Sequence, residues 1–216
     1  MRTDNFYNEK SIESLDPLSF TRLRPQVYAG DCTYSTQLLV EIISNAVDEF
    51  RAGHGNLIKV KIDKDIITVE DNGQGFIPNL IRQEDGKTVL EAAFSVLNTS
   101  GKYTEEGVYE GTALGLNGIG SKLANYLSHR LKVSSWRDGK YETVWFKEGI
   151  FEKRETGDWK DSTKPSGTLV KWQPSEEFFT HPEVDTNVIN NLFNVLVCLC
   201  AGLTIEFKDF NNFESD

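Results

Sequence analysis

The sequence predicts a mixed α/β domain, and three observations support that prediction. Apolar residues recur with a helical period over residues 38–50, which indicates an amphipathic helix. Residues 57–62 and 66–70 alternate apolar and polar side chains on either side of a short turn, which is typical of a β-hairpin. Between residues 131 and 172, four short runs rich in β-branched and aromatic residues are separated by turn signals. A chain of 216 residues with 38% hydrophobic residues can bury a substantial core around such elements.

The other expected elements complete one folded unit, which we place at residues 19–216. Residues 1–18 are polar and have no sustained period, so we interpret them as an extended N-terminal arm. No linker, internal repeat or low-complexity tract divides the rest of the chain. We expect a turn-rich lead at 22–31, helices at 88–97 and 184–199, a glycine-bearing loop at 98–111, a glycine turn that opens a helix at 115–127, and strands at 131–136, 141–146, 151–154, 167–172 and 203–207.

Composition and charge restrict the function classes. The formal net charge is −10, and neutralising phosphates requires clustered Lys and Arg, so we expect no tight grip on nucleic acid by this segment alone. No run approaches about 18 apolar residues, and the start has no apolar signal region, which predicts a cytoplasmic protein with no membrane partner. Cys32, Cys198 and Cys200 fit no zinc spacing, and we expect buried, reduced thiols.

The first long helix carries an unusual polar face. At about 100° per residue, Glu41, Asn45 and Asp48 gather within about 60° of one another, opposite the apolar face. A row of carboxylate and amide oxygens is fit to position a water molecule or a hydrated cation. An acidic, solvent-exposed face without a function is the alternative, and the helix alone leaves both open.

A second motif, Asp71-x-Gly73-x-Gly75, lies at the expected end of the hairpin. Glycines let the backbone approach a flat ring closely, and a carboxylate accepts a hydrogen bond from an exocyclic amine. An adenine meets both conditions, and Thr168 could add a hydroxyl group nearby. The motif alone is equally typical of a tight turn.

A third motif, Gly115-x-x-Gly118-x-Gly120, opens a helix. Free backbone N–H groups and the helix dipole attract anions, so this turn suits phosphate, and Lys102 on the preceding loop adds a positive charge. The motif is not a Rossmann fingerprint, because a long loop and not a strand precedes it. No P-loop terminus occurs either.

The order of these parts is more specific than any one of them. It resembles the GHKL ATPases and, within them, the ATPase domain of type IIA DNA topoisomerases: the gyrase B protein and its phage and eukaryotic relatives. The resemblance covers essentially the whole chain and implies a two-layer α/β sandwich, with a mixed, mostly antiparallel sheet and helices on one face covering the ATP site. The matching motifs are Arg24-Pro-x-x-Tyr28-x-Gly30, Glu41-x-x-x-Asn45-x-x-Asp48-Glu49, Asp71-x-Gly-x-Gly75, Ser100-Gly-Lys102-Tyr103, Gly115-Leu-Asn-Gly-Ile-Gly120 and Ser166-Gly-Thr168.

The resemblance implies roles for individual residues. Glu41 would be the general base that activates water for attack on the γ-phosphate of ATP, and Asn45 would be the one protein ligand to Mg²⁺. Asp71 would accept from the adenine amine, with support through water from Thr168 and Gly75. Lys102 and the amides of 116–120 would hold the phosphates, and Tyr109 would lie against the nucleoside. The remaining nucleotide-binding positions it implies are Asp48, Glu49, Gly73, Ile77, Pro78, Gly115, Leu116, Asn117, Gly118, Ile119 and Gly120.

The resemblance also implies partners. The arm would cross to a second subunit when ATP binds, placing Tyr7 and Ile12 on the partner's nucleotide site, so that dimer closure gates DNA strand passage. A cleavage subunit or domain would hold the DNA. The family completes its site with a lysine from a following transducer domain, and the sequence stops near Asp216 without transducer or DNA-cleavage domains. We therefore expect nucleotide binding with little or no hydrolysis.

Three positions depart from the family pattern. Gln74 stands where the bacterial enzymes carry an arginine that pairs with residue 49, and Asn117 replaces a bacterial histidine. Thr143 is interpreted as the position of an arginine that aminocoumarin drugs contact. The adenine and phosphate chemistry is compatible with all three departures, whereas drug sensitivity is in question.

Other classes remain as alternatives. A histidine-kinase-like domain would need a phosphoacceptor helix upstream, where only the arm stands. A chaperone-like or MutL-like relative would lack the Arg24-Pro25 lead and the Gly-Leu-Asn-Gly-Ile-Gly form. In a non-enzymatic domain the glycines would merely form turns.

Overall fold

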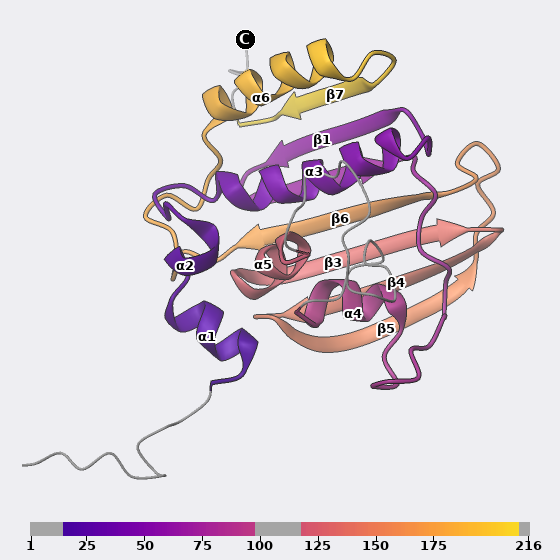
Figure 1. Cartoon of the computed structure of the whole chain (residues 1–216), viewed down its shortest axis with the longest axis horizontal. Helices are drawn as coiled ribbons and strands as arrows, with labels where there is room; N and C mark the ends of the chain where they lie inside the picture. Colours follow the sequence, from indigo (N-terminus) through magenta and orange to yellow (C-terminus); the bar gives the residue numbers. More distant parts are fainter. Residues whose placement is uncertain (1–14, 98–117, 212–216) are drawn as a thin grey trace, which may run out of the picture.

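A single twisted sheet forms one layer of the computed structural model, which describes residues 15–97 and 118–211 (Figure 1). Within those residues seven strands run in the order β5-β4-β3-β6-β2-β1-β7. All neighbouring strands are antiparallel except β1 and β7, which are parallel. The strands are β1 (Leu57–Asp63), β2 (Ile66–Asp71), β3 (Ser128–Arg137), β4 (Lys140–Lys147), β5 (Ile150–Asp158), β6 (Gly167–Pro174) and β7 (Thr204–Asp209).

Helices form the second layer, on one face of the sheet (Figure 1). The long helix α3 crosses the middle of that face, with α4 and α5 beside it, and α6 lies over the β7 edge. The helices in the described residues are α1 (Pro17–Leu23), α2 (Gln26–Ala29), α3 (Thr36–Arg51), α4 (Val89–Ser95), α5 (Gly120–Tyr126) and α6 (Thr186–Leu199). The predicted α/β fold class, with a mixed and mostly antiparallel sheet and helices on one face, is confirmed.

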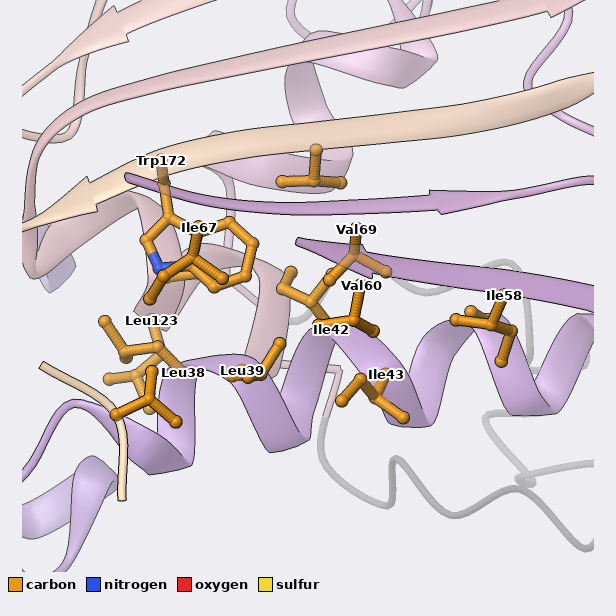
Figure 2. Close-up of a cluster of buried hydrophobic side chains, with 14 of the residues drawn as sticks. Leu38, Leu39, Ile42, Ile43, Ile58, Val60, Ile67, Val69, Leu123 and Trp172 are labelled. Atoms are coloured by element: carbon orange, nitrogen blue, oxygen red, sulfur yellow. The ribbon is translucent and has the colours of Figure 1, made fainter. Parts of the chain in front are cut away.

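The core lies between these two layers because the apolar periods of both face inward. Leu38, Leu39, Ile42 and Ile43 of α3 are nearly inaccessible to solvent. Figure 2 shows them against side chains from β1, β2, β6 and α5, with Trp172 at one end of the cluster. Burying side chains of this size contributes roughly 1.5–3 kcal/mol each, so this interface holds the helix layer on the sheet.

The first helices are the main difference from the predicted elements. Helix α1 begins at Pro17, so the expected boundary between arm and domain at residue 18 falls inside a helix. Asp16 caps it by accepting from the Ser19 N–H at 3.1 Å, and Arg22 donates to the Tyr126 carbonyl at 3.0 Å. The lead predicted as turn-rich at 22–31 therefore contains the end of α1 and the single turn α2.

The cysteine prediction is correct in part. All three thiols are free, and Cys200 is buried. Cys198 is exposed, so the expectation that it is buried is wrong. It lies near the end of α6, where Val195, Val197 and Leu199 are exposed as well.

Candidate nucleotide-binding site

The polar face of α3 meets the start of α5. The Glu41 carboxylate accepts a hydrogen bond from Gln37 Nε2 at 2.8 Å, one helical turn earlier. A Cβ atom added at Gly120, the first residue of α5, would overlap Glu41 Oε2 and lie 2.8 Å from Glu41 Cβ. Glycine at position 120 is therefore what allows this carboxylate to sit against the start of the helix. Asn45, one turn further along α3, is exposed, whereas Asp48 is buried.

The second motif packs against the same helix. The Gly73 N–H donates to Asp71 Oδ1 at 2.9 Å, and the Gln74 N–H donates to Glu49 Oε2 at 3.2 Å. A Cβ at Gly73 would lie 2.9 Å from Asp71 Oδ1 and 3.0 Å from both Cβ and Cγ of Glu49. The end of β2 and the polar face of α3 therefore approach each other closely, and the glycine is required at the point of approach.

The Asp71 carboxyl has a perturbed acidity. Its burial raises its pKa to about 7, and the negative charges of Glu49 and Glu70 add to that shift. Hydrogen bonds from the Gly73 and Thr168 backbones oppose it. A buried carboxyl group whose pKa is raised to about 7 is a common feature of ligand-binding sites.

Strands β3 and β6 support the Asp71 loop, by which we mean residues 71–79. Thr168 on β6 is the direct cross-strand partner of Asp71. The Ser135 hydroxyl on β3 donates to the Gly167 carbonyl at 3.0 Å and accepts from the Phe76 N–H at 2.8 Å. A Cβ at Gly75, whose φ is +66°, would lie 2.7 Å from the Trp136 carbonyl oxygen. The loop is consequently pressed onto the sheet, and only glycine fits at position 75.

A buried carboxylate fixes the far end of this loop. Glu142 on β4 has no exposed surface, accepts from the Asn79 N–H at 2.7 Å, and accepts from the hydroxyl of Thr88, the cap of α4. It thereby joins the loop, the helix and the sheet. We missed this residue in the sequence; the available signal was a lone carboxylate at an apolar, inward-facing position of a strand.

A hollow of about 360 Å³ opens at the rim of the site. Arg137 Nη1, at the end of β3, donates to Gln74 Oε1 across it at 3.4 Å. Arg137 was not among the site residues predicted from the sequence. The lining residues are Gly53, His54, Gly55, Asn72, Gly73, Gln74, Arg137, Asp138, Pro165 and Ser166.

Thr143 lies on β4 beside Glu142, and its interpretation as the position of a drug-contacting arginine stays a prediction. Glu142 points toward the helix layer, where it bonds Thr88, and neighbouring residues in a strand face opposite sides of a sheet. Thr143 therefore faces away from the site, where its hydroxyl lies 2.9 Å from that of Ser134. In the described residues, the arginine that lines the hollow is Arg137.

The structure thus places described residues of all three predicted motifs along α3, through two contacts. Glu41 and Gly120 form one contact, and the Asp71 loop, Glu49 and Thr168 form the other, both along α3. Ile77 is exposed and Pro78 half-buried on the following loop. Gly118 and Ile119 lead directly into α5. The other expected residues, Tyr7, Ile12, Lys102, Tyr109, Gly115, Leu116 and Asn117, lie outside the described residues.

A match to a family model decides the family. The model described as "Histidine kinase-, DNA gyrase B-, and HSP90-like ATPase" matches residues 30–168, which include the whole of α3, the Asp71 loop and Thr168. The chain belongs to this ATPase family. As a member, it is a nucleotide-binding domain.

Similarity within the family is to type II topoisomerases. The chain is 34% identical over 213 residues to the gyrase B protein of Thermotoga maritima, covering 96% of this chain and 32% of that protein. It is 36% identical over 211 residues to the corresponding B protein of the type 2 topoisomerase of Aquifex aeolicus, covering 96% of this chain and 26% of that protein. The chain therefore spans about a quarter to a third of the length of these relatives.

A solved structure agrees with the sequence matches. The topoisomerase IV ATP-binding domain of Francisella tularensis, in complex with a small-molecule inhibitor, superposes with a TM-score of 0.77 at 27% identity. The match covers 91% of this chain and 52% of that one. Among the described residues, no helix is both long enough and apolar enough to cross a bilayer.

Proposed function

We propose that this chain is the ATP-binding module of a type II DNA topoisomerase, and that ATP binds between α3, the Asp71 loop and the start of α5. The observation that carries the proposal is the close approach of the Asp71 loop to Glu49 of α3. At this point the Asp71 carboxyl is buried, and its pKa is raised to about 7. The similarity to the gyrase B protein and to a topoisomerase IV ATP-binding domain favours this reading over a kinase-like or chaperone-like one.

Asp71 would select adenine. Its Oδ1 already accepts from Gly73, so its second oxygen can accept from the exocyclic amine of the base. Thr168, the cross-strand partner of Asp71 on β6, and Gly75 would also contact the base through water. Ile77 and Pro78 would cover the ring from the following loop, because they place an apolar side chain and a rigid ring at the rim.

Glu41 would act on the phosphate end of the nucleotide. Its carboxylate lies against the first turn of α5, where free N–H groups favour anions. Lys102, Tyr109 and the amides of residues 115–120 would complete that end. Mg²⁺, when bound, would neutralise phosphate charge, with Asn45 as its protein ligand; the exposed amide oxygen and the hydrated character of this cation fit that role. Glu41 would then hold and deprotonate the attacking water.

In the whole protein, this module would couple ATP binding to the passage of one DNA segment through another. ATP binding would drive an exchange of N-terminal arms, with Tyr7 and Ile12 reaching the partner's site, and the resulting dimer closure would be coupled to DNA strand passage in the cytoplasm. The cleavage subunit or domain would carry out DNA breakage.

Calorimetric titration with the Mg²⁺ complex of a non-hydrolysable ATP analogue tests the proposal. We expect wild-type binding, a loss of at least about ten-fold in affinity for Asp71→Asn, and a change of less than about three-fold for Glu41→Ala, since Glu41 acts on the water and not on the base. The corresponding GTP analogue is the specificity control. Equally tight binding by both variants and the wild type would contradict these roles, and no binding by the wild type would reject the proposed function.

A further inference from the structure

The face of the sheet opposite the helices carries a transverse row of lysines, which we call the lysine row. It can be followed from strand to strand by register: Lys153 on β5 opposes Trp145 on β4, which opposes Lys132 on β3. Lys132 opposes Lys171 on β6, and Lys171 opposes Thr68 on β2. Thr68 opposes Lys61 on β1, and Lys61 opposes Lys208 on β7. At about 4.8 Å per strand spacing, the row spans about 29 Å.

The lysine row lies on the open face by strand alternation. Leu131, Val133 and Val170 point into the core, so their neighbours Lys132 and Lys171 point to the opposite side. Lys61, Lys153, Lys171 and Lys208 are exposed, and Lys132 is half-buried. In the part of the chain that the structure describes, only Lys61 among the five has a carboxylate within ion-pair distance, Asp63 at 3.3 Å.

The row sets like charges directly opposite each other, which destabilises a sheet. Lys132 faces Lys171, and Lys61 faces Lys208. Arg130 and Lys147, one row further along, form a third such pair. The next row on the same face, in the opposite direction along the strands, is different. There Lys59 faces Glu206, and the two form an ion pair at 3.7 Å. The lysine row therefore differs from this neighbouring row, which pairs opposite charges at Lys59 and Glu206.

We propose that the lysine row binds the phosphate backbone of double-helical DNA. A duplex carries one negative charge per about 1.7 Å, so about 29 Å of sheet faces a continuous line of phosphates. A rigid duplex on a rigid sheet loses little conformational freedom, whereas an acidic peptide or a single strand has to be ordered. Unpaired bases would not stack on the Trp145 ring, because the Lys153 and Lys132 ammonium groups lie 4.6 and 5.4 Å from its centroid.

The net charge of −10 does not prevent this contact. It is an average over the whole chain, and at about 0.1 M salt charges are screened beyond about 10 Å. The acidic side chains near the row include Asp63 beside Lys61, Asp65 bonded to Gln173, and Glu70, Glu155 and Glu206 one row away. The sequence predicts no tight grip on nucleic acid by this segment alone, and the lysine row predicts a moderate and strongly salt-dependent affinity.

Fluorescence anisotropy of a labelled 30-base-pair duplex, titrated with the 216-residue chain between 20 and 150 mM KCl, tests the proposal. We compare Lys132→Gln/Lys171→Gln with the wild type. The double variant should bind about ten-fold more weakly at about 100 mM salt, and its log–log salt slope should be about 1.8 smaller, at about 0.9 per lost phosphate contact. Thermal unfolding checks that the variant folds; removing a like-charge pair should leave its Tm unchanged or raised.

Matched controls make the outcomes decisive. Lys64→Gln/Lys160→Gln removes the same charge from two exposed lysines outside the row and should leave the slope unchanged. A loss as large in this control as in the row variant would overturn the proposal, as would absent duplex binding at 20 mM KCl. Tighter binding of labelled poly-glutamate or of a single strand than of the duplex would overturn it too. Because the test omits nucleotide, its failure leaves the proposed ATP site unaffected.

Discussion

The two faces of the sheet follow different physical rules. The helix-covered face alternates apolar side chains along every central strand, and its carboxylates Asp71 and Glu142 accept hydrogen bonds from backbone N–H groups. The open face carries Lys132 opposite Lys171 without a compensating carboxylate in the row. The side chains on the first face are therefore determined by packing, and those of the lysine row on the second face by their charge. Substitutions that violate one rule at a time separate the two contributions.

The largest effect is expected where α5 meets α3. Gly120→Ala places a methyl group onto the Glu41 carboxylate, so α5 has to move away from α3. We expect a loss of about 1–3 kcal/mol in the free energy of unfolding and at least about ten-fold weaker binding of the ATP analogue. Urea denaturation and calorimetric titration measure the two effects.

The rescue variant Gly120→Ala/Glu41→Ala is the control. It removes the overlap with Oε2 and the contact with Cδ but retains Glu41 Cβ at 2.8 Å, so stability should recover only in part. Wild-type stability and affinity in Gly120→Ala would show that α5 does not need this close approach.

A comparable effect on stability is expected at Glu142. Both of its carboxylate oxygens accept, from Asn79 and from Thr88, so Glu142→Gln turns one acceptor into a donor that faces another donor. A buried mismatch of this kind costs about 1–3 kcal/mol. Glu155→Gln, on the neighbouring strand and exposed, is the matched control and should change the unfolding free energy by less than about 0.5 kcal/mol. Equal effects in urea denaturation would mean that Glu142 does not fix the loop.

Asp71 should make stability depend on pH. Its pKa is raised from 3.8 to about 7 in the folded state, so the folded chain binds more protons than the unfolded chain between those values. The free energy of unfolding contributed by this group therefore falls as the pH rises from about 4 to about 7. Asp71→Asn, which keeps an acceptor for Gly73, should match the wild type near pH 4 and exceed it by roughly 4 kcal/mol at pH 8. Urea titrations across this range measure the difference, and a pH-independent difference would exclude the raised pKa.

Sequence periodicity predicted the elements that are long or regularly alternating. Helix α3 and the β1–β2 hairpin were found within one or two residues, because each buries one whole face. Helices α1 and α2 were missed, because they are short and α1 is held by a contact to Tyr126, 104 residues away. The motifs around Glu41 and Asp71 were visible as local patterns.

The parts that escaped prediction depend on strand order. Glu142 bonds groups 54 and 63 residues away, so no local pattern marks it. The lysine row joins residues from Lys61 to Lys208, and only the order β5-β4-β3-β6-β2-β1-β7 aligns them.

The smallest effect is expected on the open face and has the opposite sign. Lys171→Glu converts the Lys132–Lys171 pair into an opposite-charge pair and should raise the free energy of unfolding by about 0.2–1 kcal/mol. Lys171→Gln, which only removes the repulsion, should give a smaller gain. Both gains should shrink in urea titrations at about 1 M salt, where the Debye length is about 3 Å. If Lys171→Glu destabilises the chain instead, the lysines of the row do not repel one another. The difference between the two faces would then be lost, and with it one argument for the proposed DNA contact.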